Sequence, residues 1–318
     1  MWISPYKYVL SLGHLCSDIN QSILSAVLPF LIATYHYDYT TAAMLVTVSN
    51  VFGAFVQPFI GMLSDKKNKL LYMTLGVLLA SGGMAVTGFI SNFFGLCIVV
   101  IISGIGVAMF HPQAAKLINS VSSKNAKGKG MSIFSFGGKV GFTLGPVYTA
   151  FLMNLFGMKG TILFLIPGIV FGIVCSFFNK DFENLDVLEV EKKEEVKSEQ
   201  KDDWSGFIKL CGVVFSRSIL SNGISTFLAF YFIQQFSKSN SFASMLLSVF
   251  YGIGSITLLG GGIADCFGHR KMVRLSFCIF LPAIFIFTNT SHFVIALIML
   301  IFMTCGESLS YSPMVVLG

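Results

Sequence analysis

The sequence predicts an all-α membrane protein in which ten transmembrane helices form two groups, six before a charged segment and four after it. Of the 318 residues, 54% are hydrophobic and 11% are charged, whereas a soluble protein carries roughly 25% charged residues. Apolar runs of about 20 residues recur, which is the length a helix needs to cross a hydrocarbon core of roughly 30 Å. A short polar phrase also occurs twice, at 61–69 and 261–271. The bilayer is therefore the expected solvent, and the two groups are expected to be copies of one unit.

The apolar runs define the expected spans. They cover 7–33, 41–64, 70–90, 93–118, 128–156, 160–178, 205–235, 242–264, 271–289 and 292–315. The first run is too long and too polar at its middle for a cleavable signal peptide, so it is interpreted as a span. The seven cysteines are scattered without a CxxC pattern, which predicts neither a disulfide framework nor a zinc site.

The charge pattern predicts the orientation. The loops after the second, fourth and eighth spans hold eight Lys and Arg residues, whereas the alternate loops hold only Lys159 and Lys238. The positive-inside rule places the basic loops, and with them both termini, on the cytoplasmic side of the membrane. The expected membrane is the cell membrane, either a plasma membrane or an inner membrane. Most of the acids lie in 179–204, a composition typical of a solvated linker, with a regulatory docking helix as the alternative. The predicted domains are 1–178, the linker 179–204 and 205–318.

Further repeats link the two groups of spans. The stretch "QSILS" (21–25) returns as "RSILS" (217–221), and His111-Pro112 has its counterpart in Ser312-Pro313. Parallel repeats of this kind are typical of transporters built from two bundles. The second copy ends just past its fourth helix, so the last two helices of the usual twelve are expected to be missing. Either a fragment or a natural truncation accounts for this.

The repeated polar phrase is the candidate gating motif. A glycine there allows a neighbouring helix to approach closely. An acid at the cytoplasmic face can meet a helix N-terminus or a basic side chain, and the basic residues hold the loop on the anionic leaflet. The alternative is a plain positive-inside turn. The residues concerned are Gly61, Asp65, Lys66, Gly261, Asp265 and Arg270.

This phrase is similar to the G-x-L-x-D-R/K loop signature of the major facilitator superfamily. Other stretches resemble one branch of it, the fosmidomycin resistance protein family: "GHLCSDINQSILSAVLPFL" (13–31), "GIGVAMFHPQAA" (104–115), "GGKVGFTLGP" (137–146), "SRSILS" (216–221) and "YSPMVVLG" (311–318). The resemblance implies a twelve-helix secondary transporter that exports small drugs or metabolites by proton antiport, as in multidrug efflux and antibiotic resistance. It also implies that the acid of the loop contacts the start of helix eleven.

Three ionisable residues are candidates for carrying a proton. Asp18 lies about 16 Å along its helix from Lys7, near the middle of the bilayer. His14 precedes it by four residues and shares its face, and Glu307 is the only acid of the last span. An ionisable group at this depth costs roughly 2.5–3.5 kcal/mol on insertion scales, so it usually has a function. A purely structural hydrogen bond is the alternative.

Other polar residues are candidates for binding the substrate. Arg217 cannot lose its proton, so it either holds an anionic group or pairs with Asp18 or Glu307. Lys139 interrupts the glycine-rich stretch, and its role stays open. His111 is either capped by backbone near the cytoplasmic end of its helix, the favoured reading, or a ligand. Gln21 and Tyr311 complete this set. In the segment that looks like an antiporter signature, Gly141, Gly145 and Pro146 are expected to permit tight packing and a bend.

Four functions compete. Efflux by alternating access is the leading hypothesis, and two fixed cations favour anionic or neutral compounds. Uptake of a metabolite on the same scaffold is the second. An enzyme is disfavoured because no GxSxG or HExxH motif occurs, and His14 and Asp18 lack an evident third metal ligand. An inactive truncated product is the fourth.

No cofactor, metal or nucleic acid is expected. The expected partners are a small molecule, protons and membrane lipid. The protein is expected to be monomeric.

Overall fold

The computed structural model describes residues 6–64, 69–121, 127–178, 204–256 and 268–309. Within these ranges the chain is helical throughout apart from short connections, and no strand occurs. This confirms the predicted all-α class. The chain divides into two compact units, 1–196 and 197–318. The predicted linker, 179–204, lies outside the described residues except for Trp204, so its structure stays a prediction.

The described residues of the first unit form five long helices and a terminal helical segment. They are α1 (Tyr6–Tyr35), α2 (Tyr39–Ser64), α3 (Lys69–Ala85), α4 (Phe93–Ser120) and α5 (Lys127–Phe156), with the 3-10 helix η1 (Thr87–Phe89) before α4 and η3 (Gly157–Leu165) before helical residues 166–178. The second unit contains α7 (Trp204–Phe236), α8 (Asn240–Ile256), α10 (His269–Asn289) and α11 (Phe293–Leu309). The ends of most helices fall within a few residues of the predicted spans.

Seven helical stretches of the described residues are long and apolar enough to cross a bilayer. They are Tyr6–Tyr35, Tyr39–Met62, Leu70–Phe89, Phe93–Ile118, Gly130–Phe178, Trp204–Phe236 and Lys271–Asn289. The stretch Gly130–Phe178 joins two predicted spans, because a 3-10 segment links them without a break. Helix α11 is apolar but shorter.

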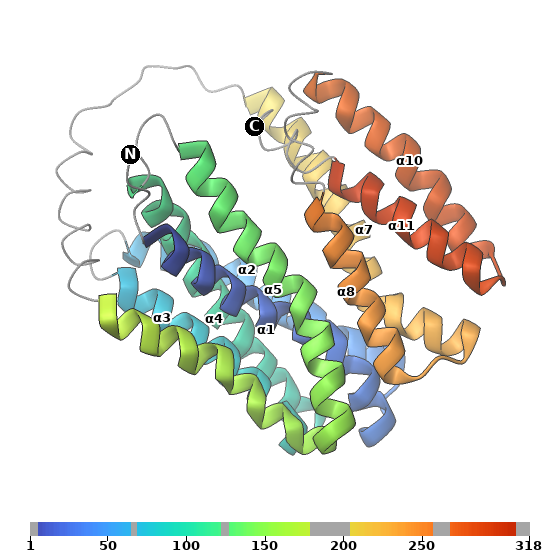
Figure 1. Ribbon diagram of the computed structural model, residues 1–318, viewed down its shortest axis with the longest axis horizontal. Coiled ribbons are helices and arrows are strands. Elements are labelled where there is room, and N and C mark those ends of the chain that lie inside the picture. Colours follow the sequence, from blue (N-terminus) through green and yellow to red (C-terminus); the bar gives the residue numbers. More distant parts are fainter. Residues whose placement is uncertain (1–5, 65–68, 122–126, 179–203, 257–267, 310–318) are drawn as a thin grey trace. The chain divides into compact units, whose positions relative to one another are not determined.

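Helix α1 occupies the centre of the first unit. In its most apolar window 78% of the residues are buried, against 22% for α2. It runs beside α5, and α4 also packs against it (Figure 1). A helix that neighbours surround can carry polar side chains without exposing them to lipid. This position explains why α1 buries Asp18, Asn20 and several serines.

Glycines on α5 make the close contact with α1 possible. A Cβ added to Gly141 would lie 2.4 Å from the carbonyl oxygen of Leu15, and one added to Gly145 would lie 2.0 Å from Oγ of Ser22. Two helices approach this closely only where one of them lacks side chains. Pro146 lies inside α5, directly after Gly145. The glycine-rich stretch therefore sets how near α5 lies to the polar face of α1.

The connections after the first helix of each unit repeat one another. His36 and Ser237 both adopt a left-handed backbone conformation, with φ of 58° and 50°. Two residues later, a side chain accepts a hydrogen bond from the first turn of the next helix: Asp38 from Thr41 N at 2.6 Å, and Ser239 from Phe242 N at 3.3 Å. Such side chains satisfy backbone N–H groups that a helix start leaves unpaired. The repeat seen in the sequence thus extends to local geometry.

Candidate functional site

The first polar centre lies on α1. The Nε2 atom of His14 is 3.2 Å from Oδ2 of Asp18, because residues four apart on a helix lie on one face. Asp18 is 3% exposed. A carboxylate with so little access to water needs a partner that supplies a proton or a positive charge.

A second histidine reaches the same carboxylate from another helix. The Nε2 atom of His111, on α4, is 3.4 Å from Oδ1 of Asp18. The backbone-capped role that was favoured for His111 is therefore wrong: the residue lies well inside α4, which continues to Ser120. We call His14, Asp18 and His111 the His–Asp–His cluster. One ligand atom from each residue can be chosen so that all lie within 4.8 Å of one another.

Two contacts fix the imidazole of His14. Its Nδ1 lies 2.8 Å from the carbonyl oxygen of Phe134 on α5, and its ring stacks on the Phe134 ring with 4.1 Å between centroids. A carbonyl oxygen only accepts hydrogen bonds, so Nδ1 carries the proton that it donates. In the neutral ring, the lone pair is then on Nε2, the atom that faces Asp18.

Helix α5 closes one side of the cluster. A Cβ added to Gly138 would lie 2.5 Å from Oδ2 of Asp18 and 2.6 Å from Nε2 of His14. Any residue other than glycine at this position would therefore displace the side chains of Asp18 and His14. The next residue, Lys139, is near enough to His14 for an electrostatic interaction, and it is half-buried. Gln21, the other candidate on α1, is exposed on its unit.

The candidate gating motif is described only in part. Four of its residues lie outside the described residues: Asp65, Lys66, Gly261 and Asp265. Of Arg270 only the backbone in α10 is described. Tyr311, a candidate for binding the substrate, also lies outside the described residues.

Among the described residues, an added Cβ at Gly61 would meet no atom within 4 Å, so the described part of the chain does not show the predicted close approach there. The carbonyl oxygen of Gly61 accepts a hydrogen bond from Nζ of Lys116 at 3.3 Å, and that of Ile60 accepts one from Gln113 at 3.4 Å. Basic groups at the end of a helix satisfy carbonyls left without partners. Sequence reasoning missed Lys116 and Gln113; their position just after the His-Pro pair was the available signal.

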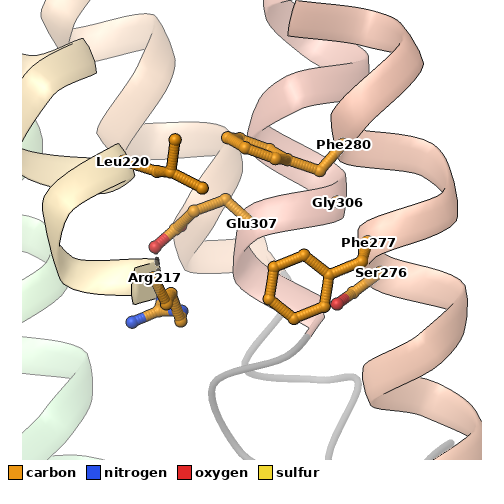
Figure 2. Close-up of a pocket in the computed structure, with 7 residues that line it drawn as sticks. All are labelled: Arg217, Leu220, Ser276, Phe277, Phe280, Gly306 and Glu307. Carbon is orange, nitrogen blue, oxygen red and sulfur yellow. Dashed lines mark hydrogen bonds and ion pairs between the residues drawn. The ribbon is translucent and has the colours of Figure 1, made fainter. Parts of the chain in front are cut away.

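The second polar centre belongs to the second unit. Arg217 on α7 donates a hydrogen bond from Nη2 to Oε1 of Glu307 on α11. Their side chains are only 15% and 12% exposed. Figure 2 shows the carboxylate directed at the guanidinium, with Leu220 beside it. The sequence suggested Asp18 or Glu307 as an ion-pair partner of Arg217, and in the structure Arg217 pairs with Glu307.

A small pocket adjoins this ion pair. It is lined by Arg217, Leu220, Ser276, Phe277, Phe280, Gly306 and Glu307. The pocket is partly open, and its enclosed part has room for about one water molecule. The aromatic rings come from α10, while α7 and α11 supply the charges (Figure 2). A charged pair beside aromatic surface is a common design of sites that hold small polar molecules.

Comparison with known proteins places this architecture. The family described as Major Facilitator Superfamily matches residues 10–318. The chain is 22% identical over 269 residues to the fosmidomycin resistance protein of Escherichia coli (strain K12), covering 83% of this chain and 66% of that one. It is 24% identical over 278 residues to the uncharacterized MFS-type transporter YfnC of Bacillus subtilis (strain 168), covering 85% and 68%. The chain thus spans about two thirds of the length of these relatives.

Solved structures share the fold at lower identity. One is a bacterial homologue of the human lysosomal transporter Spinster in an inward-facing and occupied conformation, with a TM-score of 0.78 at 17% identity. The match covers 98% of this chain and 73% of the Spinster homologue's chain. The inward-open xylose transporter XylE from E. coli has a TM-score of 0.76 at 16% identity and covers 98% and 81%. The helical repeats, the apolar spans and these matches agree, and the chain belongs to the Major Facilitator Superfamily.

Proposed function

We propose that the protein is a secondary active transporter that exports a small anionic or neutral drug or metabolite in exchange for protons. Its two units would alternate in opening a central path to either side of the membrane. Family membership supports the transport role, and the likeness to a fosmidomycin resistance protein supports a role in resistance to a small drug. The two fixed cations, Arg217 and Lys139, favour an anionic or neutral compound. In the proposed orientation both termini are cytoplasmic, and the working unit is a monomer in the cell membrane.

The observation that carries the proposal is the His–Asp–His cluster. Asp18 is buried among helices and faces two imidazoles. Burial favours the uncharged carboxylic acid, whereas a nearby cation favours the carboxylate. A change in the surroundings of Asp18 between two conformations would therefore load and release a proton. His14, held by Phe134, is the group that would share this proton.

The ion pair of the second unit would link protonation to substrate binding. Glu307 accepts hydrogen bonds from Arg217 and, at 3.3 Å, from Ser308. If Glu307 takes up a proton, the guanidinium of Arg217 loses its anionic partner and can bind an anionic group of a substrate. Proton and anion would then bind together, so this pair favours the alternative of uptake, and the exchange proposal rests on the His–Asp–His cluster. The pocket beside the pair is too small for a drug-sized molecule in this conformation, so binding the rest of a substrate would require this site to open. Lys139, Gln21 and Tyr311 are further candidates for contacts along the path.

The repeated polar phrase would control which side is open. We propose that Asp65 and Asp265, with their neighbouring Gly61, Gly261, Lys66 and Arg270, form contacts at the cytoplasmic face in one conformation and break them in the other. Hydrogen bonds from Lys116 and Gln113 to the end of α2 support a linked role for α4.

Everted membrane vesicles containing the full chain test the transport proposal. With an imposed pH gradient, uptake of fosmidomycin into the vesicles should exceed that in vesicles lacking the protein, and a protonophore should abolish the difference. The double substitution Asp18→Asn with Glu307→Gln should remove the pH-driven component, because neither side chain can then exchange a proton. His292→Ala, an exposed histidine in a connection, is the matched control and should behave as the unaltered chain.

Each outcome decides a part of the proposal. Undiminished pH-driven uptake in the double variant would refute the proton role of both acids. Flux of fosmidomycin only in the direction of the proton gradient would replace export by uptake. Vesicles with no flux above background would overturn the transporter proposal for this chain.

A further inference from the structure

We propose that the His–Asp–His cluster binds a divalent transition-metal ion of the Zn²⁺ or Co²⁺ type. The spacing of His14 and Asp18 alone supplies two ligands, and helix packing adds His111 as the third. Metal binding is independent of whether the chain transports any compound. The proposal therefore goes beyond the transport function and stands or falls separately from it.

The distances within the cluster suit a small tetrahedral ion. A metal with bonds of about 2.0–2.1 Å in tetrahedral geometry holds neighbouring ligand atoms about 3.3 Å apart. The separations from Asp18 oxygens are 3.2 Å to Nε2 of His14 and 3.4 Å to Nε2 of His111. The two imidazoles face different oxygens of the carboxylate, and one ligand atom from each of the three residues can be chosen within 4.8 Å of the others. An ion bound by all three residues therefore requires either a bidentate carboxylate or a rotation of the Asp18 side chain.

The protonation of His14 argues that something positive belongs in this gap. Because Nδ1 donates its proton to the carbonyl oxygen of Phe134, Nε2 of the neutral ring presents a lone pair to Oδ2 of Asp18. Two acceptors 3.2 Å apart repel each other. Oδ1 of Asp18 is buried, and within the described part of the chain its contact with Nε2 of His111, at 3.4 Å, does not have the geometry of a hydrogen bond. A bound cation satisfies all of these lone pairs together.

The surroundings hold the ligands as a metal site requires. A histidine ligand usually donates its second ring N–H to a carbonyl or carboxylate, which fixes the ring and leaves the other nitrogen free for the metal. The Phe134 carbonyl does this for His14, and the stacked Phe134 ring limits its rotation. Gly138 leaves just enough room beside Asp18. The cluster is thus supported by α5 as well as by α1 and α4.

The ligand set selects the class of ion. Two imidazoles and a carboxylate suit zinc, cobalt and similar metals, whereas magnesium and calcium prefer sites built of oxygen alone. Three protein ligands leave a fourth position for water or another molecule. The side chain of His111 is 28% exposed, so this histidine offers the side from which an ion can enter. Lys139 opposes the binding electrostatically and limits its strength.

A shared proton is the competing occupant of the gap, and a binding experiment separates the two. The full chain is purified in detergent, stripped of metal with a chelator and titrated with Co²⁺ alone near neutral pH. We expect one ion per chain and the visible absorption of four-coordinate Co²⁺, with Zn²⁺ displacing it. Lowering the pH should weaken binding, because protons compete for the same lone pairs.

Substitutions locate the ion. Loss of a supporting contact alone costs roughly 10–100-fold in metal affinity, so His111→Ala and Asp18→Asn should each weaken Co²⁺ binding by more than that. His292→Ala should leave it unchanged. Asp18→Asn preserves the size of the side chain, and an unchanged elution volume and melting temperature show that a variant is folded.

The proposal is overturned if the folded, unaltered chain binds no Co²⁺, in which case a proton occupies the gap. It is also overturned if Co²⁺ binds equally well to the folded His111→Ala and Asp18→Asn proteins. Neither readout involves a substrate or a proton gradient, so failure here leaves the transport proposal untouched. If the transport proposal holds as well, Zn²⁺ at this site would inhibit proton coupling.

Discussion

The Nε2 atom of His111 lies 3.4 Å from Oδ1 of Asp18, although the two residues belong to α4 and α1. This contact converts a helical His–Asp pair into a cluster of three groups. It also ties the central helix of the first unit to a neighbour through a buried charge. Any step that changes the charge of the cluster therefore changes the interaction between two packed helices, which is what a conformational switch requires.

Removal of the positive charge of Lys139 should strengthen metal binding. Its ammonium interacts electrostatically with His14 and repels a divalent ion at the cluster. In Lys139→Gln we expect the affinity for Co²⁺ to rise by about tenfold, equivalent to about 1.4 kcal/mol of lost repulsion. Titration of the purified protein measures this. Lys159→Gln removes the same charge from an exposed position in η3 and should have no effect; equal gains in both variants would contradict the interpretation.

The ion pair of the second unit should show strong coupling. Arg217→Gln leaves the carboxylate of Glu307 buried without its partner, and breaking a buried pair in this way costs about 3–5 kcal/mol. Replacing both residues by Gln should restore most of that loss. Melting temperatures of the four proteins form the double-mutant cycle. Arg274→Ala, at an exposed position of α10, is the control, and additive effects of the two single substitutions would refute the coupling.

Close packing of α1 on α5 should make Gly141 sensitive to a single methyl group. The added Cβ would lie 2.4 Å from the carbonyl oxygen of Leu15, so the helices must separate. We expect Gly141→Ala to cost about 1–3 kcal/mol of stability, the usual range for overpacking. In Gly82→Ala the new methyl group meets nothing within 4 Å, and its melting temperature should match or exceed that of the unaltered protein. Equal behaviour of the two variants would argue against the contact.

The start of α2 should be stabilised in a pH-dependent way. Hydrogen bonds from the side chain and backbone N–H of Thr41 lower the pKa of Asp38 below its ordinary value of 3.8. Because the folded state binds this proton less tightly than the unfolded state, the contribution of Asp38 is complete above 3.8. It is lost as the pH falls through the lower, folded pKa.

The melting temperature should accordingly fall in Asp38→Ala at neutral pH, and the difference from the unaltered protein should shrink in acid below 3.8. Asp38→Asn keeps an acceptor for Thr41 N without a charge. The difference in melting temperature between Asp38→Asn and the unaltered protein should therefore vary with pH. The difference in melting temperature between Asp38→Asn and Asp38→Ala should not. A constant gap between Asp38 and Asp38→Ala across this range would contradict the role of ionisation.

Much of the fold follows from the sequence because its signals are local. Apolar length sets the spans, so α1, α4 and α7 begin and end close to the predicted residues. A spacing of four residues places His14 over Asp18 before any packing is known. The repeat likewise predicts two related units, and the matching conformations of His36 and Ser237 show it in the backbone.

The sequence by itself determined the helices, the repeat and which ionisable residues lie within the apolar helices. Only the tertiary structure decided which of those charges meet: His111 turns toward Asp18 rather than capping its own helix, and Arg217 contacts Glu307. The physical reason is that rotation and approach of one helix against another depend on many small packing contacts spread over the whole interface. The combined effect of these contacts cannot be read from any short stretch of the sequence.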